Sequence, residues 1–173
     1  MERIPREYFY KYPMLFLYLA MYFFETKHFK KSLELVTEVE KHCENYEMST
    51  EMKNKLIGET AVVKFMLSYN NMDKMLSYIK EACRLLPQGS ELLSEKISVT
   101  FGNPSMLYLY YNHPGGLDRV ANAFTEVFPF WERVSSCGSG VDYLVKAEAA
   151  FERCDYESSE QDAYRAIYQA EDR

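Results

Sequence analysis

The chain has 173 residues and a formal net charge of −6, and hydrophobic residues make up 47% of it. This hydrophobic content is ample for a packed core and excludes a disordered chain. The acidic balance argues against nucleic-acid binding, which needs clustered Lys and Arg to neutralise phosphates.

Two helices are predicted near the start, after a lead-in over residues 1–12. The first covers about 13–26, opened by Pro13, and the second covers about 29–45. The uncharged run 12–24 is shorter than the roughly 17 to 25 residues of a transmembrane helix. We therefore expect a helix buried on most sides and no membrane association.

The next pair of helices has clear start and stop signals. Ser49 or Thr50 can cap a third helix over about 50–69. A fourth helix over 72–86 is ended by Pro87, which cannot continue a helix.

The second half is less regular. Residues 90–100 give no clear signal, and a short helix is expected over 106–111. A long amphipathic helix follows over about 117–135. A glycine-rich turn at 137–140 then precedes two amphipathic helices over 141–171.

Apolar residues recur at fixed distances from three helix starts, Phe29, Met72 and Tyr156. The positions nine and six residues before each start, and seven and ten residues after it, are all apolar. They are Ala20, Phe23, Val36 and Val39; Val63, Met66, Ile79 and Ala82; and Ala147, Ala150, Ala163 and Ala166. The starts are 43 and 84 residues apart, and 84 is twice 42, so another turn is expected near residue 114.

Helix pairs that repeat every 34 to 47 residues or so are typical of α-solenoids. We therefore predict an all-α fold, namely a tetratricopeptide-like α-solenoid of about four antiparallel helix pairs in a right-handed superhelix. The single predicted domain covers 1–173, with units at about 13–45, 50–87, 104–135 and 140–172.

No catalytic or metal-binding pattern is found. The four cysteines show no CxxC spacing and form no ligand pattern with the three histidines, so reduced thiols in a cytoplasmic protein are expected. Gly115-Gly116 follows no strand, and Asp118 would repel phosphate, so no ATP loop is expected. The pair Glu148 and Glu152 is expected on a solvated helix face. We expect no enzyme activity and no cofactor.

Three segments resemble a known family: IPREYFYKYPMLFLYLAMYFF, TFGNPSMLYLYYNHPGGLDR and GSGVDYLVKAEAAFERCDYESSEQDAYRAIYQAE. They are similar to the central helical-repeat region of large LuxR-type bacterial transcriptional regulators of the maltose-regulon-activator type. The resemblance implies an ATP-binding module before this region and a helix-turn-helix DNA-binding domain after it. The 173 residues hold no Walker motif and no basic recognition helix. We therefore expect a cut-out segment or a truncated homologue.

The predicted function is binding. In stacked helix pairs the first helix of each pair lines the inner surface, which gives the candidate binding residues Tyr22, Lys64, Tyr108, Tyr111 and Tyr143. The tyrosines of the irregular stretch 102–116 fit either a pocket wall or packing between helices. The expected partner is a small-molecule inducer, another protein or a second copy of the chain. The segment itself is expected to bind no nucleic acid. The alternative is a structural adaptor that self-associates through the ends of the array.

Overall fold

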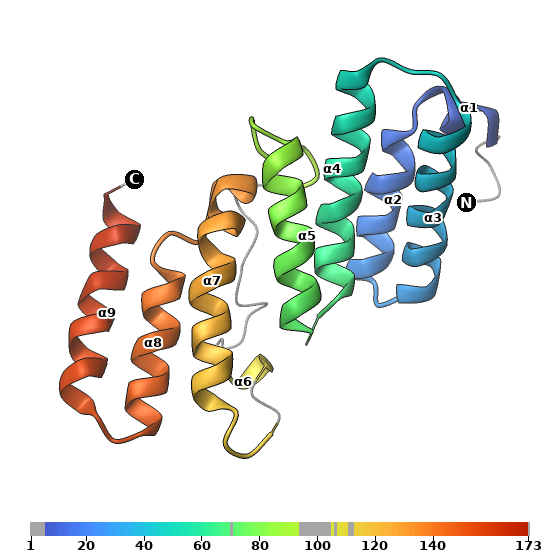
Figure 1. Ribbon diagram of the computed structural model, residues 1–173. Helices are drawn as coiled ribbons and strands as arrows, with labels where there is room; N and C mark the ends of the chain where they lie inside the picture. The colour runs from blue at the N-terminus through green and yellow to red at the C-terminus, as the bar shows by residue number, and fades with distance from the viewer. Residues whose placement is uncertain (1–5, 70, 94–104, 106, 111–112, 173) are drawn as a thin grey trace.

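The structure, a computed structural model, describes residues 6–69, 71–93, 105, 107–110 and 113–172, and these residues form helices and turns (Figure 1). The all-α prediction is confirmed for them. The helices are α1 (Arg6–Lys11), α2 (Met14–Glu25), α3 (Phe29–Asn45), α4 (Thr50–Leu67), α5 (Met72–Leu85), α6 (Leu107–Tyr110), α7 (Leu117–Ser135), α8 (Val141–Glu152) and α9 (Tyr156–Glu171).

The longer helices stand side by side in one row that begins with the pair α2 and α3, with α3 outermost, and ends with α9 (Figure 1). Long helices that follow one another in the chain run antiparallel, except that α5 and α7 point the same way and pack directly on each other. The short α6 lies against α7 and α8 instead of standing between α5 and α7. A continuous cluster of buried apolar side chains extends along the row, from Phe16 in α2 to Ala149 in α8.

Most helix boundaries follow the local signals in the sequence. α3 and α7 cover the predicted 29–45 and 117–135. The Ser49 side chain accepts a hydrogen bond from the Met52 amide at 3.2 Å, as a helix cap does. The lead-in holds the additional helix α1, which was not predicted. Residues 94–104, which include most of the stretch without a clear signal, lie outside the described residues.

The twelve recurring apolar positions are mostly in the core. Ten of them are buried, and only Ala163 and Ala166 are half-buried. Both belong to α9, which contacts α8 on one side and buries no residue completely. The recurring positions therefore mark helix contacts, and those in α9 are less covered because α9 is the last helix of the row.

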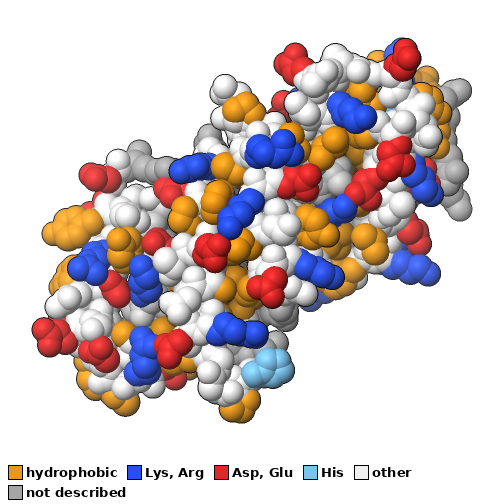
Figure 2. Space-filling model, viewed as in Figure 1, with side chains coloured by type: hydrophobic (Ala, Val, Ile, Leu, Met, Phe, Trp, Pro, Cys, Tyr) orange, Lys and Arg blue, Asp and Glu red, His pale blue; other side chains and the backbone are white. Residues whose placement is uncertain are grey.

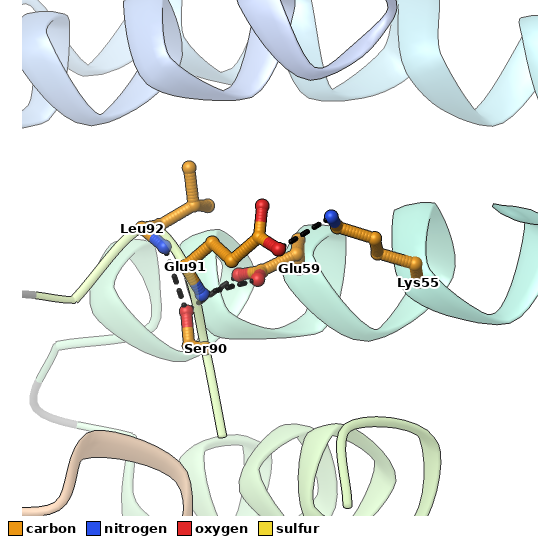
Figure 3. A network of polar contacts seen from close by, with 5 residues as sticks. All are labelled: Lys55, Glu59, Ser90, Glu91 and Leu92. Atoms are coloured by element: carbon orange, nitrogen blue, oxygen red, sulfur yellow. Dashed lines mark hydrogen bonds and ion pairs between the residues drawn. The ribbon is translucent and has the colours of Figure 1, made fainter. Parts of the chain in front are cut away.

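A buried carboxylate holds the chain that follows α5. Glu59 in α4 has no exposed surface, and it accepts hydrogen bonds from the Ser90 hydroxyl at 2.5 Å and the Glu91 amide at 2.6 Å (Figure 3). The Ser90 amide in turn donates to the Val134 carbonyl of α7 at 2.7 Å. Burial raises the pKa of Glu59, although the hydrogen bonds from Ser90 and Glu91 partly oppose this shift.

Replacing Glu59 with Gln should change the pH dependence of stability. A carboxyl whose pKa is raised by folding contributes its full stability below its unfolded-state pKa, near 4.5, and loses it as the pH rises through the folded-state pKa. The free energy of unfolding should therefore fall less with rising pH in Glu59→Gln than in the wild type. Urea titrations at a series of pH values measure this. The surface variant Glu126→Gln is the control, and equal slopes in the two variants would contradict the effect.

Two glycines offer a matched test of the contact between α8 and α9. Gly140 and Gly115 have φ angles of +83° and +76°. A Cβ on Gly140 would lie 2.4 Å from the carbonyl oxygen of Ala166, whereas nothing lies within 4 Å of one on Gly115. Gly115→Ala should cost only the left-handed backbone penalty of about 1–2 kcal/mol. Gly140→Ala should cost a further 1–3 kcal/mol or so, because α9 must move. Urea unfolding of both variants measures the difference, and equal losses would be evidence against the close approach.

Candidate binding groove

A groove of about 520 Å³ lies between α3, α4 and α5. This volume falls within the range of about 300–1,000 Å³ that is common for small-molecule sites. The charged side chains that line it balance, with three lysines and three glutamates: Lys41, Lys53, Lys64, Glu40, Glu44 and Glu81.

The α4 wall of the groove follows from helical spacing. Lys53, Ile57, Thr60 and Lys64 stand at i, i+4, i+7 and i+11, so they share one face of the helix. Most other positions of α4 after its first two turns are buried against α2, α3 or α5. The α4 wall of the groove is therefore a polar face of a helix whose other positions are largely buried.

Lys64 is held by side chains from both neighbouring helices. Its ammonium forms an ion pair with Glu40 of α3 and lies 5.5 Å from the ring centre of Tyr78 in α5. The Lys64 side chain is only 26% exposed, so both interactions are partly shielded from water. A cation held over an aromatic face gains about 0.5–1 kcal/mol at exposed sites and more when desolvated. The geometry presents a fixed hydrogen-bond donor beside a carboxylate acceptor.

Two buried side chains also line the groove. Thr60 is 4% exposed, and its hydroxyl oxygen has no hydrogen-bond partner among the described residues. An unsatisfied buried polar atom costs about 1–3 kcal/mol, so a ligand that reaches this hydroxyl would gain by pairing with it. Cys43 is 5% exposed, and burial raises the pKa of its thiol. A protonated, buried thiol is a poor nucleophile.

A second cavity, of about 340 Å³, lies between α6 and α8. Glu148 accepts hydrogen bonds there from the Ser105 hydroxyl at 2.9 Å and the Leu107 amide at 2.8 Å. The Tyr108 hydroxyl donates to Glu152, and this bond raises the pKa of Tyr108. The expected solvated face is therefore wrong for Glu148, which is half-buried because it holds the start of α6.

The predicted binding residues lie in different surroundings. Lys64 lines the groove, and Tyr108 lines the second cavity. Tyr22 is 56% exposed on α2, and its ring meets the edge of Phe23. Tyr143 is half-buried beside the cations of Lys146 and Arg165 in α8 and α9. Tyr111 lies outside the described residues. Among the described residues, no hydrogen bond, ion pair or ring contact joins two of these four, so their common surface stays a prediction.

Sequence reasoning missed most of the groove. It selected Lys64 but not its partner Glu40, which lies 24 residues away and meets it only through the packing of α3 on α4. One signal was present in the sequence. Lys53, Thr60 and Lys64 form a polar stripe at helical spacing among apolar residues, as expected for a helix with one face open to a groove.

The lining of the groove combines charged, hydroxyl and apolar side chains. No group of His, Cys, Asp and Glu within the described ranges could hold a metal ion. Where the structure describes the chain, no helix is both long enough and apolar enough to cross a membrane. Comparison with known proteins finds no matching family model, no matching curated protein and no matching solved structure.

Thiol labelling should show that Cys43 is enclosed. Cys154 is exposed and should react with iodoacetamide at the rate of an open thiol. Cys43 should react roughly tenfold or more slowly, because it is buried and its raised pKa leaves little thiolate. Mass spectrometry of peptides sampled over time at pH 8 gives both rates. Equal rates would mean that Cys43 is open to solvent.

Proposed function

We propose that this chain is a non-catalytic binding module that takes a neutral, polyhydroxylated small molecule in the groove between α3, α4 and α5. The observation that carries the proposal is the balanced lining of the groove around Lys64 and Glu40. A hydroxyl group both donates and accepts hydrogen bonds, so a ligand rich in hydroxyls matches a lining that holds both ammonium and carboxylate groups. An anionic ligand would meet three carboxylates in the same space.

The module that we propose is a tetratricopeptide-like α-solenoid of about four antiparallel helix pairs in a right-handed superhelix. Three contacts support this arrangement. The long helices that follow one another in the chain pack together, α2 packs on α4, and α5 packs parallel to α7. In such an array the first helices of neighbouring pairs touch each other, as do the second helices. On this assignment α6 is a shortened first helix of the third pair.

The biological role that we propose is signal sensing within a LuxR-type transcriptional regulator. Support for this role comes from the three segments that resemble the helical-repeat region of that family. DNA binding would belong to a separate helix-turn-helix domain, and the module would report ligand occupancy to it.

Calorimetry with a panel of neutral sugars and polyols tests the binding proposal, with amino acids and nucleotides as charged comparators. A neutral member should bind, and Lys64→Met should weaken its binding about tenfold or more, equivalent to about 1.4 kcal/mol. The loss has two causes, because the variant removes a donor and leaves Glu40 without its partner.

Lys80→Met is the matched control. Lys80 also forms an ion pair, with Glu126 at 2.9 Å, and lies 5.4 Å from the ring centre of Phe130, but it does not line the groove. Its loss should leave the affinity unchanged. An equal loss in both variants, or preferential binding of nucleotides, would refute the proposal.

A further inference from the structure

The last helix, α9, carries three exposed apolar side chains, which we call its outer face. They are Tyr164, Ile167 and Tyr168, and they are 56%, 51% and 71% exposed. Figure 2 shows hydrophobic side chains reaching the surface at this end of the row. Neighbouring apolar residues on one side of a helix form a patch of the kind that marks interaction surfaces.

The contacts between α9 and α8 show which way the outer face points. The Ser159 hydroxyl donates a hydrogen bond to the carbonyl of Ala147 in α8 at 2.9 Å. Ala166, at i+7 from Ser159, lies on the same side of α9 and is half-buried. Because an α-helix turns by about 100° per residue, Tyr164 and Tyr168 lie about 140° and 180° around the axis from Ser159. The outer face therefore points away from α8.

Two other helices, α3 and α5, carry polar side chains where α9 carries these tyrosines. The recurring apolar positions align the starts of the three helices at Phe29, Met72 and Tyr156. Tyr164 and Tyr168 stand eight and twelve residues after the start of α9. The residues at the same two positions are all exposed, and they are Thr37 and Lys41 in α3 and Lys80 and Arg84 in α5. The packing of the row therefore does not require tyrosine at these positions.

Acidic side chains border the outer face at both ends. Glu157 and Glu160 precede the tyrosines along α9, and Glu171 follows them. All three glutamates are exposed, and none forms an ion pair among the described residues. The one basic residue of α9, Arg165, is paired with Asp162 at 2.9 Å. The outer face therefore presents apolar area between negative charges that no ion pair balances.

This distribution of charge decides which kind of partner fits the outer face. Two outer faces laid together would bring glutamates against glutamates in either direction, because both ends of the face are acidic, and like charges across an interface are costly. Nucleic acids and anionic membranes would meet the same repulsion. A surface that carries apolar residues between basic residues is complementary to the outer face.

A pair of tyrosines on α2 provides a comparison. α2 exposes Leu15, Tyr18 and Tyr22, so the expectation that this helix is buried on most sides is wrong along these residues. The exposed Lys11 and Glu25, near the two ends of α2, have opposite charges and so indicate no particular partner. Tyr18 and Tyr22 have the same i, i+4 spacing as Tyr164 and Tyr168, which makes them a matched control.

We propose that the outer face of α9 binds a basic amphipathic helix of a partner protein. The face runs from Glu157 to Glu171, which is about 21 Å at the rise of an α-helix, so a partner helix of about four turns matches it. Apolar side chains at i, i+3, i+4 and i+7 of that helix cover the tyrosines, and Lys or Arg at its ends pair with the glutamates. Tyrosine suits such a contact because its ring buries apolar area while its hydroxyl stays hydrated. The proposal does not depend on the groove, which α9 does not line.

Three synthetic peptides, each about as long as the outer face, test the proposal. The lysine peptide has leucines at i, i+3, i+4 and i+7 with lysines at both ends. The glutamate peptide has the same leucines with glutamates in place of the lysines, and the third peptide has the composition of the first in scrambled order. Fluorescence anisotropy of the labelled peptides should show the lysine peptide binding about tenfold or more tightly than the other two. Salt at about 0.5 M should weaken this binding, because it screens the charges.

Tyr164→Thr combined with Tyr168→Lys gives α9 the residues that α3 carries at the equivalent positions. Both tyrosines are exposed, so circular dichroism should show unchanged folding. The affinity for the lysine peptide should fall about tenfold or more, because the variant loses both aromatic anchors and gains a like charge. The control variant, Tyr18→Thr with Tyr22→Lys, makes the same changes on α2 and should leave the affinity unchanged.

Glu160→Lys combined with Glu171→Lys reverses the charge at both ends of the outer face, so this variant should prefer the glutamate peptide. Failure of the wild type to bind the lysine peptide, an unchanged preference in the charge-reversed variant, or an equal loss in the α2 control would overturn the proposal. A wild type whose mass in light scattering grows with concentration, unless Tyr164 and Tyr168 are replaced, would also overturn it, because a second copy would then cover the face. Lys64→Met should bind the lysine peptide like the wild type, which separates this result from the test of the groove.

Discussion

The hydrogen bonds that Glu59 accepts are the interaction on which the middle of the molecule depends. They hold residues 90–91 against α4, while the Ser90 amide binds the end of α7. The end of α5 and the end of α7 are thereby joined on the same side of the row, so the two helices lie parallel and pack directly (Figure 1). A hydrophobic side chain at position 59 would fill the space but would leave the donors of residues 90 and 91 unsatisfied.

Much of the fold could be predicted because helix ends are local events. The cap at Ser49, the break after α5 at Pro87 and the glycine-rich turn before α8 are each readable within a few residues. The joint at Glu59 was not predictable in this way. A glutamate in the sequence gives no sign that the chain will fold back over it 31 residues later.

The candidate site shows the same difference between local signals, which the sequence reveals, and contacts between distant segments, which it does not. The selection of Lys64 rested on helix order alone, and the structure surrounds it with Glu40 and Tyr78, whose positions depend on how α3 and α5 pack against α4. Glu148 looked solvated because nothing local indicates that α6 lies against α8. Side chains that are set by the register between helices remain beyond sequence reasoning, whereas those set by spacing along one helix do not.

The exposure of α9 also has a kinetic consequence. Because α9 buries no residue completely and packs mainly on α8, it separates from only one long helix when it opens. Native proteins open locally from such regions at a free energy well below that of global unfolding. The amide hydrogens of α9 would then exchange with solvent by local fraying. Those of α4 would exchange only when the whole row unfolds. Any molecule that covers α9 would slow this exchange, so amide protection reports occupancy of that end directly.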